Sequence, residues 1–181
     1  PFTTSTLQQE ASRKLGMSVQ LTMMTAQSLY EAGLITYMRT DSVNLSDTAL
    51  EATRGMICAT MGEKYHQRRQ FKTDTKGAQE AHEAIRPTVF ENQTIDGTPA
   101  EQRLYKLIWN RAVASQMADA QIERTSISIA SPDPKERFIA SADVIKFDGF
   151  MKLYIEGDDN DDSTDSPTAV LPSVEVGDAL T

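Results

Sequence analysis

A tyrosine and an arginine two residues apart, Tyr37 and Arg39, are the residues best suited to chemistry. They lie in and just after a β-prone run, 34–38, and residues at this spacing in a strand point to the same side, about 7 Å apart. Both could then reach one phosphate: the guanidinium would hold its non-bridging oxygens while the phenol attacks phosphorus. A phenol has a pKa near ~10, and a nearby positive charge favours its ionised form. The pair indicates a nucleophile for phosphoryl transfer; the alternative is a packing tyrosine beside a turn that Asp41 stabilises.

A second candidate group is His82 and Arg86, four residues apart in the run 80–88. His82-Glu83 is half of a zinc-peptidase motif, but that motif needs a second histidine at the position of Arg86, so the zinc reading fails. If the segment is helical as far as Pro87, the imidazole and the guanidinium suit phosphate contacts. The alternative is a solvated turn in which Glu83 pairs with Arg86.

The segment 63–80 is polar and basic, and we predict a mobile surface loop there. Such a loop fits phosphate contacts and an ordinary solvated surface equally well. Its basic side chains are His66, Arg68, Arg69, Lys72 and Lys76. The sequence lacks a glycine-rich phosphate loop, an Asp-x-Asp-x-Glu cluster and a Ser/His/Asp arrangement.

The elements that must position Tyr37 are predicted to be two helices. Ser5 and Gln8 suggest a capping box for the first, and Gly16 is its expected end. The second should run over 18–32, with Gly33 as its end. Its predicted inner stripe is Val19, Thr22, Met23, Ala26, Leu29 and Tyr30.

Two further helices are predicted before residue 118. Ser46 can cap a helix over 46–61. Thr98, followed by Pro99 and by Glu101, is the strongest helix start in the chain. That helix should run to about Met117, with Trp109 or Tyr105 on a flank.

After residue 120 the pattern becomes typical of strands. Runs at 125–130, 137–147 and 150–155 are β-prone, and Asp148-Gly149 is a turn signal. The acidic segment 157–167 is predicted to be a disordered loop, and 170–180 is again strand-like.

The composition of the chain excludes several classes of protein. The chain has 181 residues, 39% apolar and 24% charged, which is ordinary for a soluble globular protein. No stretch approaches the ~20 apolar residues of a membrane span. The single cysteine, Cys58, excludes an internal disulfide and suits a reducing cytoplasm. Residues 1–125 hold 14 basic and 14 acidic side chains, whereas 126–181 hold 4 and 12, so the net charge of −8 does not forbid DNA binding by the first part.

Three of these motifs together resemble type IA DNA topoisomerases. The run Leu34–Ser42 resembles the family's active-site signature, and Pro1–Gln8 and His82–Thr88 resemble two further segments in the expected order. Phe147–Phe150 and Leu171–Asp178 resemble its later β-rich region. The residue Met38 before the arginine and the full His-Glu-Ala-Ile-Arg-Pro run resemble the bacterial topoisomerase I branch.

The resemblance implies a mechanism. Tyr37 would attack a phosphodiester in a single-stranded DNA segment, forming a 5′-phosphotyrosine and freeing a 3′ hydroxyl. After strand passage the reverse attack would reseal the strand, relaxing negative supercoils without ATP. Arg39 would stabilise the scissile phosphate, and His82 would bind phosphate and support proton transfer. Arg86 and Met17 are further implied DNA-binding residues.

The resemblance also implies an α+β fold. Residues 1–118 would be a mainly helical, winged-helix-like gate domain, and 119–181 part of a β-rich arch with the acidic loop near 157–167. The family's Mg²⁺ is bound by an N-terminal domain that nothing here matches, so we expect no metal site in this chain and expect that domain of the same polypeptide as a partner.

The chain begins with Pro1, and we expect it to be an internal fragment that does not relax supercoils alone. The resemblance places the whole protein in the bacterial cytoplasm, at the nucleoid and not at a membrane.

Two alternatives remain. One is a non-catalytic winged-helix DNA-binding module in which Tyr37 is structural; the substitution Tyr37→Phe would distinguish it from an enzyme. The other is a tyrosine recombinase or replication nuclease, which the early position of the tyrosine disfavours.

Overall fold

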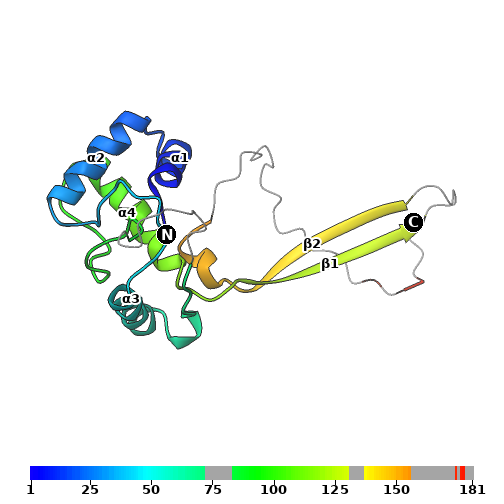
Figure 1. Cartoon of the computed structure of the whole chain (residues 1–181). Helices are drawn as coiled ribbons and strands as arrows, with labels where there is room; N and C mark the ends of the chain where they lie inside the picture. Colours follow the sequence, from blue (N-terminus) through cyan, green and yellow to red (C-terminus); the bar gives the residue numbers. More distant parts are fainter. Residues whose placement is uncertain (72–82, 131–136, 156–173, 175, 178–181) are drawn as a thin grey trace. The chain divides into compact units, whose positions relative to one another are not determined.

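The computed structural model describes residues 1–71, 83–130, 137–155, 174 and 176–177 (Figure 1). The chain divides into two compact units. The helical unit comprises the described parts of Pro1–Asp119 and Gly149–Gly157, and the second comprises those of Ala120–Asp148 and Asp158–Thr181. The described residues form four α-helices and one two-stranded antiparallel sheet, which confirms the predicted α+β class.

The helix α1 (Thr4–Leu15) is capped two residues before the predicted cap. Thr3 is the N-cap, and its side chain and that of Thr6 form the capping box with each other's backbone N–H groups. The prediction of Ser5 as the cap was wrong because Ser5 already lies within the first helical turn. Gly16 ends the helix with a φ of 64°, as predicted.

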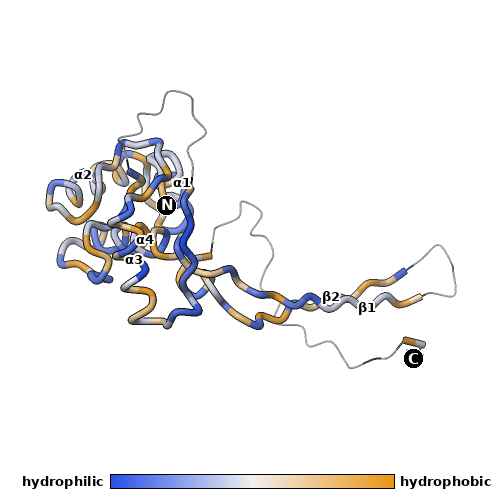
Figure 2. The backbone as a smooth tube through the Cα atoms, turned by 60° about the horizontal axis from the view of Figure 1, so that its bottom comes forward, coloured by the Kyte–Doolittle hydropathy of each residue, from blue (hydrophilic) through white to orange (hydrophobic). Residues whose placement is uncertain are grey.

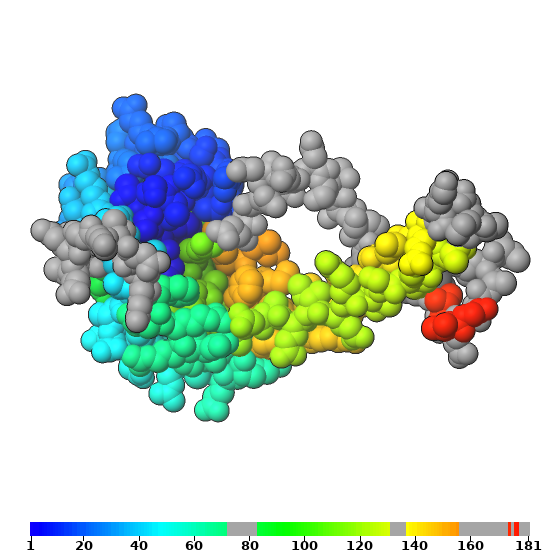
Figure 3. Space-filling view, turned by 45° about the vertical axis from the view of Figure 1, so that its right-hand side comes forward, coloured from blue at the N-terminus to red at the C-terminus, as the bar shows by residue number. Residues whose placement is uncertain are grey.

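The helix α2 (Val19–Glu31) is capped by Ser18, but its buried face is narrower than predicted. Val19 and Tyr30 were predicted to be inside and are 55% and 40% exposed. The side chains that are buried recur at spacings of three and four, and Tyr30 follows the last of them by one position, about 100° around the helix. The buried residues are Thr22, Thr25, Ala26 and Leu29. Figure 3 shows α1 and α2 (blue) as adjoining parts of the surface of the helical unit.

The helices α3 (Asp47–Thr60) and α4 (Pro99–Ala114) start as predicted. Ser46 caps α3, and Thr98 and Glu101 form the capping box of α4. The helix α4 ends three residues earlier than the predicted Met117, because the chain tightens into turns after Ala114.

The core of the helical unit is built around α4. Trp109 and Tyr105 were expected on a flank, but both are fully buried. Each can lie inside because its polar atom has a partner: Trp109 Nε1 donates to Phe90 O at 2.8 Å, and Tyr105 Oη donates to Asn92 O at 2.6 Å. Burial raises the pKa of Tyr105 to about 12.

The strands β1 (Gln121–Ala130) and β2 (Arg137–Phe147) form an antiparallel hairpin, with an irregularity at the Gln121 end. Figure 2 shows hydrophilic and hydrophobic residues along both strands. The hairpin buries little surface, and cross-strand pairs such as Arg124 with Asp143, at 2.7 Å, hold its exposed side chains.

The predicted strand over 150–155 is wrong. Residues Gly149–Lys152 form the 3₁₀ helix η2, and the N–H of Phe150 donates to Ala118 O at 2.9 Å. Gly149 has a φ of +50°, and a Cβ there would lie 2.5 Å from Ala118 O. The backbone at position 149 passes so close to Ala118, just after α4, that only glycine fits there. The residues that follow form η2 and therefore do not pair as a strand.

The acidic segment 157–167 and most of 170–180 lie outside the described residues. Among the helices described here, none is both long enough and apolar enough to cross a membrane.

Candidate active site

The segment that carries Tyr37 lies beside the segment after His82. Ile35 and Pro87 form an isolated antiparallel bridge, the N–H of Thr36 donates to Arg86 O at 2.9 Å, and the N–H of Thr88 donates to Leu34 O at 3.0 Å. Residues 83–88 are therefore extended, so the helix on which the spacing of His82 and Arg86 would have suited phosphate contacts is not present over these residues. Its backbone groups find partners in the tyrosine-bearing segment rather than in a helix of their own.

The start of α1 fixes the other end of the tyrosine-bearing segment. Thr4 Oγ1 donates to Met38 O at 2.8 Å, and the N–H of Thr4 donates to Thr40 O at 2.9 Å. Phe2 forms a further bridge with Ile85. The three segments that carry the sequence motifs thus meet, and the backbone on both sides of Tyr37 is held by hydrogen bonds.

Tyr37 and Arg39 both face outward. The predicted strand over 34–38 is wrong, because its pairing with the segment 83–88 is limited to the bridge at Ile35 and the two backbone hydrogen bonds beside it, too few for a regular ladder. The alternation of a strand persists nevertheless: Met38 and Thr40 are buried, whereas Tyr37 is 41% exposed and Arg39 is exposed. Within the described part of the chain Arg39 has no ion-pair partner, so its guanidinium is available to an anion.

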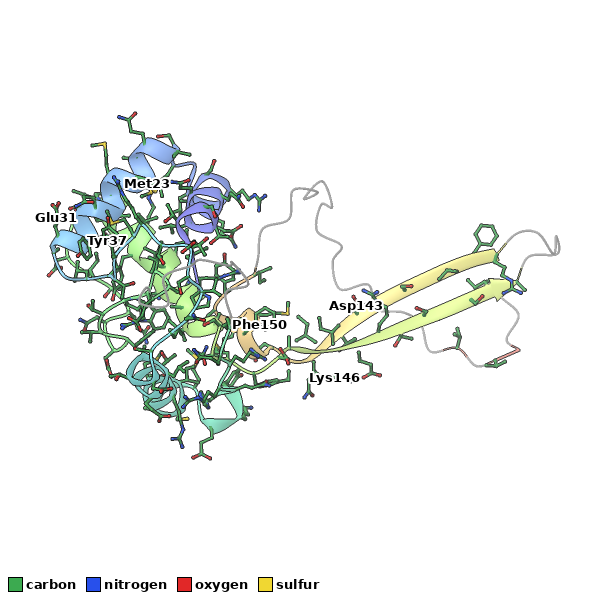
Figure 4. All side chains as sticks on the ribbon, viewed as in Figure 1. Met23, Glu31, Tyr37, Asp143, Lys146 and Phe150 are labelled. Atoms are coloured by element: carbon green, nitrogen blue, oxygen red, sulfur yellow. The ribbon has the colours of Figure 1, made fainter. Side chains whose placement is uncertain are left out.

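Tyr37 lies against a second tyrosine that the sequence analysis assigned to the core. Its ring and that of Tyr30 meet edge to face, with ring centroids 5.2 Å apart and an interplanar angle of 65°. Figure 4 shows Tyr37 beside the end of α2, where Glu31 is also labelled. The contact between the two tyrosines could have been inferred from Gly33, because a glycine turn at the end of α2 reverses the chain and brings the following residues beside the last turn of the helix.

His82 lies outside the described residues, and Arg86 is partly buried. Its Nη2 donates to Glu83 Oε2 at 2.6 Å and its Nη1 donates to Pro87 O at 3.0 Å, with 14% of the side chain exposed. The alternative pairing of Glu83 with Arg86 is confirmed, although the pair is half-buried rather than solvated. Buried Arg86 Nε has no hydrogen-bond partner in the structure as described.

Glu83 also binds the start of α3, since its Oε1 accepts from the N–H of Ser46 at 2.7 Å. Burial alone would raise the pKa of the Glu83 carboxyl. The hydrogen bonds from Ser46 and Arg86 and the charge of Arg86 outweigh burial, and the pKa lies below its ordinary value. Glu83 is therefore an anionic link between the candidate site and α3.

The basic segment 63–71 is only partly the loop that was predicted. Glu63–Tyr65 is the 3₁₀ helix η1, and Tyr65 is buried. Arg68 pairs with Asp47 and Glu51, at 2.6 and 3.0 Å, and Arg69 pairs with Asp119 at 2.6 Å; Lys72 and Lys76 lie outside the described residues. Burial first, then the charges of Arg54 and Arg68, lower the pKa of His66 despite the opposing charge of Glu51.

Met17 is 2% exposed and packs in the core of the helical unit. The structure shows a packing role for Met17, and its place at the DNA stays a prediction. Across the described ranges, no three His, Cys, Asp or Glu side chains come together as metal ligands.

Known proteins are similar in sequence to this chain along its whole length. The sequence model of the family described as DNA topoisomerase matches residues 1–181. The DNA topoisomerase 1 of Synechocystis sp. is 50% identical, covering 98% of this chain and 20% of the relative. That of Streptomyces coelicolor is 49% identical, covering 100% and 20%.

A solved structure shares the fold. Full-length topoisomerase I from Thermotoga maritima is 39% identical with a TM-score of 0.77, covering 97% of this chain and 29% of that one. The match of the family model to residues 1–181, with relatives 50% and 49% identical over almost all of the chain, shows the class: this is a chain of the DNA topoisomerase family. The chain belongs to the bacterial type IA DNA topoisomerases and spans about a fifth of the length of the curated relatives it matches.

Proposed function

We propose that the whole protein containing this chain cuts and reseals one DNA strand, with Tyr37 as its nucleophile. The observation that carries this proposal is the placement of Tyr37: the phenol is exposed while the backbone around it is held by Thr4 and by the segment 83–88. A fixed backbone with an exposed side chain suits a nucleophile, because its attacking atom must reach the phosphorus from one direction.

In the proposed reaction, Tyr37 Oη forms a bond to the phosphorus of a phosphodiester in a single-stranded segment of DNA. The bond from phosphorus to the 3′ oxygen breaks, the phenol loses its proton, and the 3′ oxygen leaves as a hydroxyl. The 5′-phosphotyrosine keeps the phosphodiester's bond energy, so attack by the 3′ hydroxyl after strand passage reverses the step without ATP. The net result is relaxation of negative supercoils.

Arg39 is proposed to bind the non-bridging oxygens of the same phosphate. It lies two residues from Tyr37 on the same exposed side and has no carboxylate partner among the residues described, and a guanidinium stabilises the charge that develops on phosphate oxygens. His82 is proposed to bind phosphate and support proton transfer. Arg86 is also proposed to bind DNA, through the 14% of its side chain that is exposed beside its ion pair with Glu83.

The whole protein is proposed to bind Mg²⁺ through a domain N-terminal to this sequence, which would also be the partner of Tyr37's site. We infer that the chain by itself does not relax supercoils, and that the whole protein works in the bacterial cytoplasm on the nucleoid DNA.

The test uses the complete topoisomerase polypeptide that contains this sequence, with labelled single-stranded DNA and Mg²⁺, quenched with denaturant. The unsubstituted protein should carry a covalent DNA adduct, and Tyr37→Phe should abolish it while DNA binding stays within about twofold. The control is Tyr105→Phe, which also removes one hydroxyl but from a buried tyrosine outside the site; it should keep the adduct.

An adduct that persists in Tyr37→Phe would rule out this nucleophile. If the unsubstituted protein binds DNA but forms no adduct, the DNA-binding module without catalysis is the correct function. Relaxation of plasmid by the pure chain of residues 1–181 would contradict the inference that it is inactive alone.

A further inference from the structure

Tyr30 is a large aromatic side chain that the helical core does not use. It is 40% exposed at the end of α2, and the ring contact with Tyr37 is an edge-to-face pair of two exposed rings. The two rings therefore pack against each other outside the core of the helical unit.

The backbone around Tyr30 is fixed, and this fixes the direction in which its side chain leaves the helix. Leu29 is fully buried and fixes the rotation of the last turn of α2. The N–H of Gly33 donates to Tyr30 O at 2.8 Å, and that of Leu34 donates to Leu29 O at 2.9 Å. Thr88 Oγ1 then donates to Gly33 O at 2.7 Å. The turn is therefore tied both to the helix and to the extended segment 83–88.

Tyr37 has no comparable anchor for its side chain. In the part of the chain that the structure describes, its hydroxyl makes no hydrogen bond, and its neighbours Met38 and Thr40 point the other way, into the protein. A side chain that is 41% exposed can occupy several staggered rotamers. The edge-to-face contact with Tyr30 favours one of these rotamers over the others.

We propose that Tyr30 is a positioning residue, whose ring holds the ring of Tyr37 so that its hydroxyl points outward in the orientation needed for attack. This inference rests on the proposed function, in which Tyr37 is the nucleophile. A contact between exposed rings favours the paired rotamer by a modest factor, and holding a nucleophile in the reactive orientation raises the rate of the chemical step. Because both rings are partly in solvent, the contact contributes little to the stability of the fold.

The experiment measures single-turnover adduct formation with labelled single-stranded DNA by the complete polypeptide. Tyr30→Ala should slow adduct formation at saturating DNA roughly three- to tenfold and leave the DNA concentration for half-saturation within about twofold. Tyr30→Phe keeps the ring and should restore the rate. The matched control is Leu21→Ala, a side chain on the same helix that is 42% exposed and should have no effect. Thermal unfolding of all four proteins should be alike.

Three results would overturn the inference: a normal rate in Tyr30→Ala, equal loss in Tyr30→Phe and Tyr30→Ala, or equal loss in Leu21→Ala. If Tyr30→Ala is too unstable to assay, Tyr30→Leu, which keeps an apolar side chain without a ring, must show the same loss for the inference to stand. The proposed function fails separately, by the absence of any adduct on the unsubstituted protein or by its persistence in Tyr37→Phe.

Discussion

Glu83 shows how a single residue can serve the candidate site without facing it. Its two carboxylate oxygens bind different parts of the helical unit: one accepts from Ser46 at the start of α3, and the other pairs with Arg86 beside the tyrosine-bearing segment. Removing its charge would leave the partly buried guanidinium of Arg86 without its carboxylate.

We expect Glu83→Gln to lower the free energy of unfolding by about 1–2 kcal/mol at pH 7. The pKa of Glu83 in the folded protein lies below its ordinary value of 4.5, so the ionised carboxylate stabilises the fold fully above that pH. This contribution is lost as the pH falls through the folded pKa. Urea unfolding of both proteins at pH 7 and at successively lower pH should show the difference narrowing below 4.5; a constant difference would contradict the assignment.

At the scale of elements, the start of α1 determines where the tyrosine-bearing segment is anchored. Thr3 caps the helix, and the next residue, Thr4, binds Met38 O and Thr40 O. The cap and the anchor are adjacent, so loss of the cap should loosen both the first turn of α1 and the backbone on one side of Tyr37.

We expect Thr3→Ala to destabilise the protein by about 1 kcal/mol, the usual cost of losing a helix cap. The matched control is Ser5→Ala, which removes a hydroxyl two residues away that makes only an exposed contact, at 3.1 Å, with Thr3 Oγ1. It should change stability by less than about 0.5 kcal/mol, since Ser5 lies inside the helix where alanine is favourable. Chemical unfolding of the two variants measures both effects. A larger loss in Ser5→Ala would mean that the helix begins at the residue expected from the sequence.

At the scale of the molecule, the hairpin β1–β2 is an insertion in the helical unit. The chain leaves that unit after Asp119 and returns at Gly149, where the backbones touch: the N–H of Phe150 donates to Ala118 O at 2.9 Å. Tyr154 then packs back on α1, with its hydroxyl donating to buried Glu10 at 2.6 Å. The helical unit therefore closes on itself without the hairpin.

We expect residues 120–148 to be replaceable by a short Gly-Ser linker without unfolding the helical unit. The two ends already meet, so a short linker adds little loop entropy, and the hairpin alone buries too little surface to be essential to the core. The shortened protein should keep its α-helical circular dichroism and a single cooperative thermal transition. Loss of that transition would show that the two units fold as one.

Much of the helical unit could be predicted from the sequence because its signals are local. The caps at Ser46 and Thr98 and the end at Gly16 depend on residues within one helical turn, and the structure has them where the sequence indicates. The two-residue spacing of Tyr37 and Arg39 likewise predicted that both side chains face the same way, and both are exposed even though the segment is not a strand.

What the sequence could not determine depends on partners far away in the chain. Residues 83–88 are extended because their backbone binds the segment around Thr36, 50 residues earlier, and no local pattern encodes that pairing. The burial of Arg86 has the same cause. Helix caps are decided by short-range hydrogen bonds, whereas the surroundings of Tyr37 are decided by which distant segments pack together, and only the tertiary structure decides that.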